Sequence, residues 1–295
     1  MRFKIYILSI ASLLFLSGNS FAKKKLKEFE TTRVMQSAGA GVGALLINEV
    51  TVLNPAAITF IKDSTLYYQR SKTNLNDKNT SRNTYKEGQN EFLGFSDTTT
   101  PLKGGFSYLY QNEQEGNRKR FSLSSSGNVT KTTSLGMVYK YTDEFSDIID
   151  NTYHQFTFGL THIYDENIYL GLVVVDPQNK ISEYSHYTLG IQYVMNNFIH
   201  ILLDVGSGDT ANSDKKAFTR YALQINSFQY FYFRTGRFHD KFNNIKGYTY
   251  GVSWVGPKFS IDYAYKNAEF ISDDSEELYD GEHLIETSIA LSALF

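Results

Sequence analysis

The sequence contains no cysteine, only four prolines and a single tryptophan among its 295 residues. Without cysteine it can form neither disulfides nor thiolate zinc sites, and it has no cysteine nucleophile. Beyond the N-terminus no apolar run approaches the roughly 18 residues that a membrane-spanning helix needs. The formal net charge of −2 provides no basic surface for nucleic acid, so no nucleic-acid partner is expected. These absences exclude a disulfide scaffold and a helical membrane protein.

Aromatic residues are abundant instead, with 22 tyrosines and 22 phenylalanines. Aromatic side chains favour pleated sheets, and proline, which interrupts them, is scarce here. The mean hydropathy is nevertheless −0.34, so apolar and polar residues must be interleaved rather than segregated.

The first 22 residues have the layout of a secretory signal peptide. Arg2 and Lys4 precede an apolar core at residues 5–16, and a small-x-small cleavage site ends at Ala22. This core is too short for a permanent anchor. We therefore expect residues 1–22 to be removed during export.

From residue 64 onward the dominant pattern is alternation with a period of two, which is typical of β-strands. One face of each segment carries large apolar residues and the other carries small or polar ones. The clearest example sets Phe259, Ile261, Tyr263 and Tyr265 against Ser260, Asp262, Ala264 and Lys266. A soluble sandwich would expose a face rich in lysine and glutamate. The small, polar second face suits a crowded lumen better, and it repeatedly includes a mid-strand glycine: Gly136, Gly159, Gly171, Gly190 and Gly251.

The connections between these segments alternate between short and long. Short ones lie at residues 165–166, 196–197, 226–227 and 256–257, and longer ones at 143–152, 176–185, 206–216, 239–244 and 267–283. Short turns on one rim and longer loops on the other are typical of outer-membrane β-barrels.

The predicted fold is therefore an all-β transmembrane antiparallel β-barrel of about 14 strands, occupying residues 64–295. The expected strands are 64–75, 89–96, 103–112, 118–126, 131–142, 153–164, 167–175, 185–195, 198–206, 217–226, 228–238, 245–255, 258–267 and 284–295. An even number returns both chain ends to the short-turn side. If one early hairpin lies outside the wall, the count falls to 12.

The last strand ends in an aromatic residue. Ile289, Leu291 and the terminal Phe295 share one apolar face. This arrangement resembles the C-terminal signature of barrels inserted by the outer-membrane barrel assembly machinery, which is therefore an expected partner. The alternative is an ordinary edge strand that ends in phenylalanine.

Residues 23–63 have a different character from the strands. They begin with a basic patch, pass through a stretch containing Gly39, Gly41 and Gly43, and end shortly after Asn54, Pro55 and Ala56. The segment is too short for a domain, and its glycines permit tight turns and close approach to a wall. We expect it to fold inside the lumen as an N-terminal hatch, or plug.

With this segment in view, the sequence resembles the FadL/TodX family of outer-membrane transporters for hydrophobic compounds. The resemblance consists of the signal peptide, the glycine-rich hatch, the Asn54-Pro55-Ala56 motif, about 14 strands and the terminal aromatic residue. It implies a hydrophobic ligand inside the barrel, released by hatch movement and a lateral opening, and it places Asn54, Pro55 and Ala56 in the hatch. The longest strand connection here is about 17 residues, whereas the family's long-chain fatty acid transporters have extended helical loops that capture the ligand.

No pattern of residues predicts an enzyme, a metal site or a cofactor. The Gly39-x-Gly41-x-Gly43 stretch lacks the preceding strand and the Lys-Ser/Thr pair of a phosphate-binding loop. The six histidines show no zinc-ligand spacing, and there is no Gly-x-Ser-x-Gly motif. Convergence of catalytic groups from different strands, as in barrel hydrolases, stays an alternative without a supporting motif.

The function predicted from these features is passive transport of hydrophobic small molecules, such as fatty acids or aromatic compounds, across the outer membrane of a Gram-negative bacterium. A general diffusion porin and a structural or surface-interaction barrel remain as alternatives. Outer-membrane lipid and lipopolysaccharide are the expected surroundings. The last loop is acidic, and it either bridges to lipopolysaccharide through divalent cations or is simply solvated; its acids are Glu269, Asp273, Asp274, Glu276, Glu277, Asp280 and Glu282.

Overall fold

The computed structural model describes residues 26–46, 48–76, 86–113, 116–146, 150–179, 181, 184–208, 216–271 and 283–295. The predicted signal peptide lies outside these ranges, and so do all acidic residues of the predicted last loop except Glu269.

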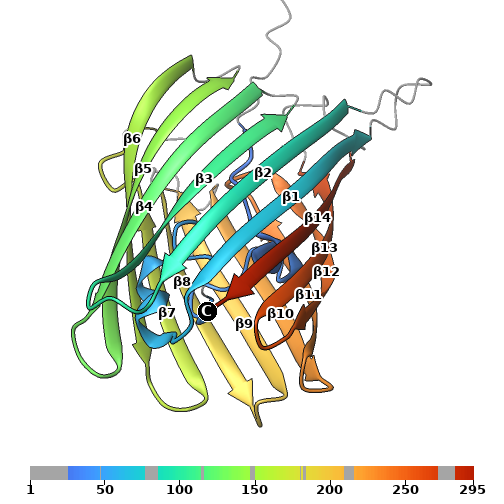
Figure 1. The fold of residues 1–295 in the computed structure, drawn as a ribbon. Helices are drawn as coiled ribbons and strands as arrows, with labels where there is room; N and C mark the ends of the chain where they lie inside the picture. The colour runs from blue at the N-terminus through green and yellow to red at the C-terminus, as the bar shows by residue number, and fades with distance from the viewer. Residues whose placement is uncertain are drawn as a thin grey trace, which may run out of the picture.

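Fourteen antiparallel strands form one closed barrel (Figure 1). Each strand pairs with its neighbours in sequence, and β1 pairs with β14 to close the wall. The predicted count of 14 is confirmed, and the alternative of 12 is excluded because both early hairpins belong to the wall. The strands are β1 (Thr65–Asn76), β2 (Lys86–Asp97), β3 (Lys103–Glu113), β4 (Gly116–Asn128), β5 (Thr133–Ser146), β6 (Asp150–Ile163), β7 (Ile168–Val175), β8 (His186–Met195), β9 (Ile199–Gly208), β10 (Ala217–Ser227), β11 (Phe231–Asp240), β12 (Ile245–Val255), β13 (Phe259–Phe270) and β14 (His283–Leu294).

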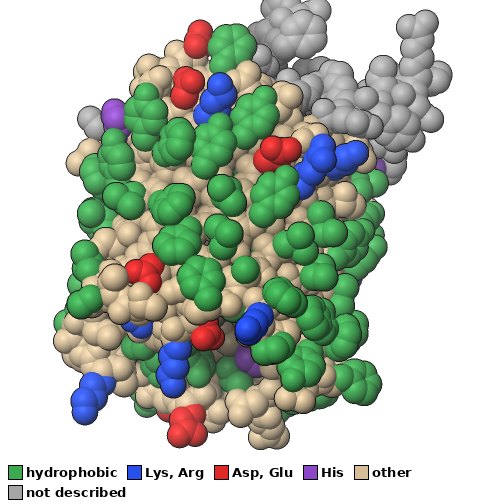
Figure 2. All heavy atoms as spheres, in the orientation of Figure 1, with side chains coloured by type: hydrophobic (Ala, Val, Ile, Leu, Met, Phe, Trp, Pro, Cys, Tyr) green, Lys and Arg blue, Asp and Glu red, His purple; other side chains and the backbone are tan. Residues whose placement is uncertain are grey.

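The strands place large apolar side chains on the outside of the barrel and small or polar ones inside. In β13, Phe259, Ile261 and Tyr263 are each more than 40% exposed, whereas Ser260 and Asp262 are fully buried. Figure 2 shows hydrophobic side chains spread over the middle of the viewed face. An apolar outer surface around a polar interior is the arrangement of a membrane-spanning barrel.

The two ends of the barrel differ in their connections. At the turn end, where β1 begins and β14 ends, the connections 98–102, 129–132, 164–167, 196–198, 228–230 and 256–258 have three to five residues. At the opposite loop end the connections vary in length, and the longest joins β13 to β14.

The prediction of a long connection is wrong at one place. Residues 143–152 were expected to form a loop, but Asp143 pairs with Thr152 and Phe145 with Asp150, so β5 and β6 are joined by residues 147–149 alone. The ladder continues beyond the apolar belt, where polar side chains are tolerated on the outer face. Hydrophobic alternation therefore stops before the strands do.

Two short helices lie between residue 26 and β1 in the described part of the chain. In α2 (Thr32–Gln36) the Thr31 hydroxyl accepts a hydrogen bond from the Val34 N–H, and η1 (Pro55–Phe60) begins at Asn54, whose side chain accepts from the Ala56 N–H. These are N-cap contacts. None of the described helices is long and apolar enough to cross a membrane.

Candidate functional site: the lumen segment and its cavity

Residues 26–63, here called the lumen segment, run through the barrel from the loop end to the turn end (Figure 1). At the loop end the Lys27 ammonium forms an ion pair with Glu286 of β14. At the turn end the Lys103 ammonium donates to the carbonyls of Thr59 and Ile61, at 3.0 and 2.9 Å. The segment therefore fills the lumen over most of its height.

Ion pairs fix the first part of the lumen segment to opposite sides of the wall. On one side Glu28 lies 3.1 Å from the Arg120 guanidinium and 3.7 Å from that of Arg118, both on β4. On the other side Glu30 pairs with Lys266 of β13 at 2.7 Å. Removing one partner of such a buried pair leaves an uncompensated charge, so these contacts oppose displacement of the segment.

The surroundings shift the pKa values of the carboxyl groups of the lumen segment in different directions. Burial alone would raise the pKa of Glu28, but Arg120 and Arg118 outweigh burial and hold it below its ordinary value. The pKa of Glu30 is likewise lowered, because Lys266 outweighs burial. For Glu49 burial prevails over the attraction of Arg33, and its pKa is raised. Glu28 and Glu30 therefore act as fixed negative charges, whereas an ionised Glu49 is a cost to the folded state.

Helix α2 docks on β11, β12 and β13 through polar contacts. The Arg33 Nε donates to Asp262 at 3.1 Å, and its Nη2 donates to the Ser260 hydroxyl at 2.9 Å. The Gln36 amide donates to the carbonyls of Val252 and Tyr263, at 3.0 and 2.9 Å. Inward-facing strand side chains and strand backbone carbonyls thus satisfy these polar groups of the helix.

The glycine stretch predicted for the hatch lies where the chain turns after α2. Gly39 has a φ of +82° and Gly41 a φ of +149°, conformations that residues with a Cβ rarely adopt. The Asp204 carboxylate of β9 accepts from the backbone N–H groups of Gly41 and Val42, at 2.9 and 3.0 Å. Gly43 lies against the backbone of Gly190 in β8.

Six inward-facing glycines of the wall lie directly beneath the lumen segment, and together they are called the glycine track. A Cβ at any of them would lie less than 3.0 Å from an atom of the segment. The pairs are Gly136 with Ala56, Gly159 with Asn54, Gly171 with Val42, Gly190 with Gly43, Gly236 with Ala38 and Gly251 with Gln36. Five of these are the mid-strand glycines singled out in the sequence. Their small size allows the segment to approach the wall backbone.

Asn54 fixes the start of η1 to the rest of the segment and to β6. Its amide nitrogen donates to the Val42 carbonyl at 2.8 Å and to the Thr161 hydroxyl at 3.1 Å. The carbonyls of Pro55 and Ala56 accept from the hydroxyls of Ser126 and Ser134, at 2.5 and 2.8 Å. The three motif residues are therefore buried against β4, β5 and β6 near the turn end.

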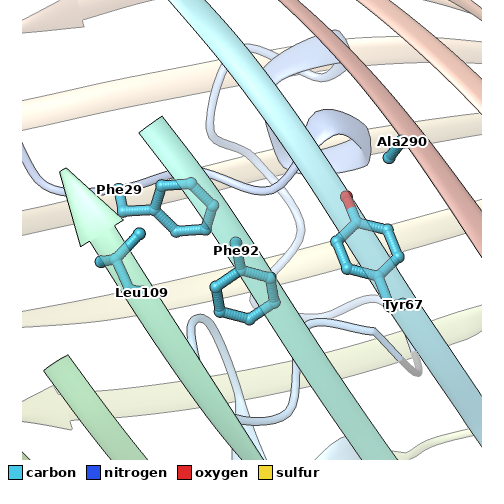
Figure 3. Close-up of a cluster of buried hydrophobic side chains, with 5 residues drawn as sticks. All are labelled: Phe29, Tyr67, Phe92, Leu109 and Ala290. Atoms are coloured by element: carbon cyan, nitrogen blue, oxygen red, sulfur yellow. The ribbon is translucent and has the colours of Figure 1, made fainter. Parts of the chain in front are cut away.

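An aromatic cluster holds the segment against the first strands (Figure 3). Phe29 of the segment stacks on Phe92 of β2, with ring centroids 4.9 Å apart. The Tyr67 ring of β1 contacts Phe92 edge-on at 5.8 Å, and its hydroxyl accepts from the Thr32 N–H. Leu109 completes the apolar contacts around Phe29. Such aromatic pairs stabilise packing beyond their buried area.

A cavity of about 80 Å³ lies between the lumen segment and the barrel wall. Its lining is mixed, with apolar side chains from both the segment and the wall and with ionisable groups beside them. The apolar members are Phe29, Val34, Ala38, Val42, Val52, Leu53, Val173, Val175, Phe238, Phe242 and Ile245; the ionisable ones are Lys27, Glu28, Glu30, Lys140, His186, Arg220, Asp240 and Lys266. A second cavity of about 20 Å³ adjoins Glu28, Phe29, Val52 and Lys140.

Lys140 of β5 lines both cavities and is 4% exposed. Within the described part of the chain, no side chain forms an ion pair or hydrogen bond with its ammonium group. Most other cations of this region are engaged, for example Arg220 with Asp240 at 2.8 Å. A buried ammonium without a partner is costly unless a ligand or water completes its contacts.

The other predicted site residues lie on the outer surface. Ile289, Leu291 and Phe295 are 53%, 52% and 65% exposed, and the Phe295 ring stacks on Phe95 of β2. In the described ranges no three His, Asp or Glu side chains are placed to hold a metal ion together.

No family model matches this chain, and a search of curated proteins finds no relative. Solved structures do match. The CymD monoaromatic hydrocarbon channel aligns with a TM-score of 0.63 and 11% identity, covering 90% of this chain and 97% of that one. The Pseudomonas putida toluene transporter TodX gives 0.64 and 9%, with coverages of 93% and 99%. The Ralstonia pickettii toluene transporter TbuX gives 0.64 and 10%, with coverages of 90% and 98%.

The chain has the fold of the FadL/TodX-type channels. A Pseudomonas aeruginosa FadL homologue also aligns, with a TM-score of 0.59, 12% identity, and coverages of 90% and 98%. The resemblance predicted from the signal peptide, the glycine stretch and the Asn-Pro-Ala motif is thus confirmed at the level of fold. At 9–12% identity the alignment of this FadL/TodX-type barrel with those channels concerns the backbone and says nothing of ligand contacts.

The charged wall residues that contact the lumen segment were missed in the sequence. Their signal is an isolated charge on the small-residue face of a strand, as at Lys140, Asp204 and Asp262. That pattern identifies inward-facing charges. It does not say which charge meets which residue of the segment, because the partners are 42 to 259 positions apart and depend on the barrel's register.

Proposed function

We propose that this protein is an outer-membrane channel for passive movement of small hydrophobic molecules, in which residues 23–63 act as a hatch. The observation that carries this proposal is the cavity beside the lumen segment, because apolar groups from both the segment and the wall line it. A ligand there loses its water shell against apolar side chains, and concentration alone sets the direction of its movement.

The size of the cavity requires the hatch to move. An engineered apolar cavity of about 150 Å³ holds one benzene molecule, whereas this cavity measures about 80 Å³. Even a monoaromatic compound therefore needs more room than this cavity offers. Displacing residues 27–42 away from the wall enlarges the space, at the cost of breaking contacts such as the Glu30–Lys266 pair.

The ligand class includes aromatic hydrocarbons and fatty acids. CymD is described as a monoaromatic hydrocarbon channel, and TodX and TbuX as toluene transporters. The apolar lining favours ligands of that kind. Lys140, which adds an unpaired ammonium group to the same cavity, favours ligands that also carry an oxygen acceptor or a carboxylate.

The proposed location is the outer membrane of a Gram-negative bacterium, after cleavage of the signal peptide near Ala22. The exposed apolar wall then contacts outer-membrane lipid and lipopolysaccharide. The exposed terminal Phe295, with Ile289 and Leu291 on the same face of β14, is proposed as the signal recognised by the barrel assembly machinery. No enzymatic role is proposed.

The proposal is tested by uptake through the full chain and through a variant lacking residues 23–60. Both are placed in vesicles with a lipopolysaccharide leaflet, which slows unassisted entry of labelled toluene or octanoate. We expect uptake above empty vesicles with the full chain, and leakage of small sugars only with the variant. Equal sugar permeability of both proteins would identify a diffusion porin instead.

A second candidate function is a structural barrel that transports nothing. The network of buried ion pairs that ties the lumen segment to β4, β13 and β14 favours it. In that case the full chain takes up neither toluene nor octanoate, while deletion of the segment lowers the melting temperature of the barrel.

A further inference from the structure

A basic patch lies on the outer face of the β11–β12 hairpin, near the loop end. It consists of Arg237 and His239 on β11, Lys241 in the connecting turn and Lys246 on β12, all exposed. His239 pairs directly with Lys246 across the two strands, and Arg237 pairs with Tyr248 two positions away. Cross-strand and diagonal neighbours lie about 5 and 7–8 Å apart, so one anionic group can reach several of these side chains.

Permanent charge is otherwise scarce on this side of the wall. On the outward positions of β7 to β14, within the described residues, the only lysine and arginine are Arg237 and Lys246, and the only acid is Glu269. Glu269 is opposite Lys246 in the ladder but lies 3.7 Å from His283. In the described structure no ion pair or side-chain hydrogen bond engages Arg237, Lys241 or Lys246. Among the described residues, the three cations of the patch therefore outnumber the one acid beside them.

Two other outward strand cations are opposite an acid, whereas Lys72 of β1 is opposite Gln89 and Thr287. Arg70 lies 4.0 Å from Glu91 and donates to Gln89, and Lys119 pairs in the ladder with Asp143. Arg237 has tyrosines on both sides instead, because its ladder partners are Tyr221 on β10 and Tyr248 on β12. These rings are 50% and 45% exposed, which is the setting of an interfacial aromatic girdle.

A charge on the lipid face of a barrel is destabilising unless it reaches the interface or an opposite charge. Arg237 is the seventh residue of β11 counted from the turn end. At about 3.3 Å per residue and the tilt of a barrel strand, it stands roughly 15 Å above that end, within an apolar band about 25 Å tall. Its side chain is long enough to extend toward the loop end, where Lys241 and Lys246 lie.

We propose that Arg237, Lys241 and Lys246 bind the phosphate groups of lipid A in the outer leaflet. A phosphate with two ionised oxygens matches a cluster of two or three cations on neighbouring strands. The acyl chains of the same molecule lie against Tyr221, Tyr248 and the apolar wall toward the turn end. The proposal rests on the outer-membrane location in the proposed function and does not depend on transport.

Lipid A, rather than a phospholipid, is the occupant because of where the patch lies. In single-chain bacterial barrels the short turns face the periplasm, so the loop end with its basic patch faces the outer leaflet. That leaflet consists of a glycolipid with two phosphates, whereas the inner leaflet holds phospholipids with one.

The test is a lipid titration followed by native mass spectrometry of the detergent-purified full chain. The probes are bis-phosphoryl lipid A, monophosphoryl lipid A and phosphatidylglycerol. The variant is Arg237→Gln with Lys246→Gln, and the matched control is Lys119→Gln with Lys258→Gln, which removes the same charge from exposed positions elsewhere on the barrel. An unchanged melting temperature for both verifies folding.

Each cation near a lipid surface changes affinity about fivefold, so we expect the Arg237/Lys246 variant to bind bis-phosphoryl lipid A about 25-fold more weakly than the parent. The control variant should bind within twofold of the parent, and the parent should prefer two phosphates over one. Equal weakening in both variants, or equal binding of phosphatidylglycerol and lipid A by the parent, overturns the proposal. If the parent protein does not bind lipid A but still takes up toluene in vesicles without lipid A, the lipid A proposal fails and the proposed transport function stands.

Discussion

Asn54 joins distant parts of the molecule with one side chain. Its oxygen accepts from the Ala56 N–H, which starts η1, and its nitrogen donates to the Val42 carbonyl and the Thr161 hydroxyl. The side chain is 2% exposed, so no bulk water replaces a lost partner. The motif residue thus fixes the turn-end part of the lumen segment to the glycine stretch.

Replacing Asn54 by alanine should loosen the lumen segment. The Val42 carbonyl then loses its donor in a buried setting, which costs about 1–3 kcal/mol. We expect a lower melting temperature and faster protease cleavage within residues 38–60. Asn54→Asp keeps the acceptor for Ala56 but lacks the donor, so a full return to parent stability in this variant would refute the role assigned to the amide nitrogen.

Lys140 should select among ligands. We expect Lys140→Met to lower octanoate or benzoate uptake about tenfold, since a hydrogen bond between charged groups contributes about 1.5–3 kcal/mol, and to leave toluene uptake unchanged. Lys140→Arg keeps the charge and should retain carboxylate uptake. Equal losses for toluene and benzoate would mean that Lys140 supports the barrel rather than the ligand.

At the scale of elements, the lumen segment and the wall are complementary surfaces. The segment brings its backbone close to the wall, and the glycine track removes the side chains that would prevent this. Inward-facing charges then meet the charged residues of the segment. The strands thus present large apolar side chains on their outward faces, while their inward faces receive the segment.

Gly171→Ala tests that complementarity. A Cβ at Gly171 would lie 2.0 Å from the Val42 carbonyl oxygen, whereas nothing lies within 4 Å of a Cβ at Gly127. The first substitution should displace the lumen segment and lower the melting temperature, and Gly127→Ala should not. The measurement is thermal unfolding followed by heat-modified gel mobility; similar midpoints for both variants would contradict the close approach.

The pH dependence of the segment's stability has opposite signs at two carboxyl groups. The folded-state pKa of Glu49 is raised from its ordinary 4.5, so ionised Glu49 destabilises the folded state above that pH, and the cost disappears as the pH falls below it. Glu49→Gln should therefore raise the melting temperature at pH 8 and have little effect at pH 4.

Glu28 provides the matched control. Its folded-state pKa is lowered, chiefly because Arg120 outweighs burial, so its stabilising contribution is present above pH 4.5 and is lost as the pH falls toward its folded-state pKa. Glu28→Gln should lower the melting temperature at pH 8. Parallel pH profiles for the two variants would contradict this assignment.

The sequence predicts the strands better than the contacts of the lumen segment, because only the strands carry a periodic pattern. The strands and the outward faces follow from a two-residue alternation that each segment carries by itself, and β13 shows it from Phe259 to Lys266. The mid-strand glycines were visible as a pattern, but their role was not, because it depends on which residue of the segment lies above each one. For the same reason Asn54 was found through a motif, while its partner Thr161 was not.

At the scale of the whole molecule, a closed wall surrounds a segment that is fixed at both ends. Every strand is paired on both sides, although the ladder between β6 and β7 covers only Thr157–Ile163 of β6. Under the proposed function, a ligand passes when the lumen segment moves away from the wall. Buried ion pairs and the docking of α2 make this movement costly, which suits a channel that stays closed to polar solutes.

The central claim is that the hatch moves during transport, and a reversible cross-link tests it most directly. The Thr32 and Ser288 hydroxyl oxygens lie 2.7 Å apart, joining α2 to β14, and the chain has no cysteine of its own. A Thr32→Cys, Ser288→Cys variant therefore places two sulfurs within reach of a disulfide. Ser260→Cys with Ser292→Cys is the control, since those hydroxyls lie 3.0 Å apart on two wall strands.

The measurement is uptake of labelled toluene by a Gram-negative host that lacks its own channel of this fold. The account predicts that oxidation of the Thr32/Ser288 variant lowers uptake at least tenfold, that a reductant restores it, and that the Ser260/Ser292 variant is unaffected by either treatment. Full uptake through the fully cross-linked Thr32/Ser288 protein would contradict a moving hatch.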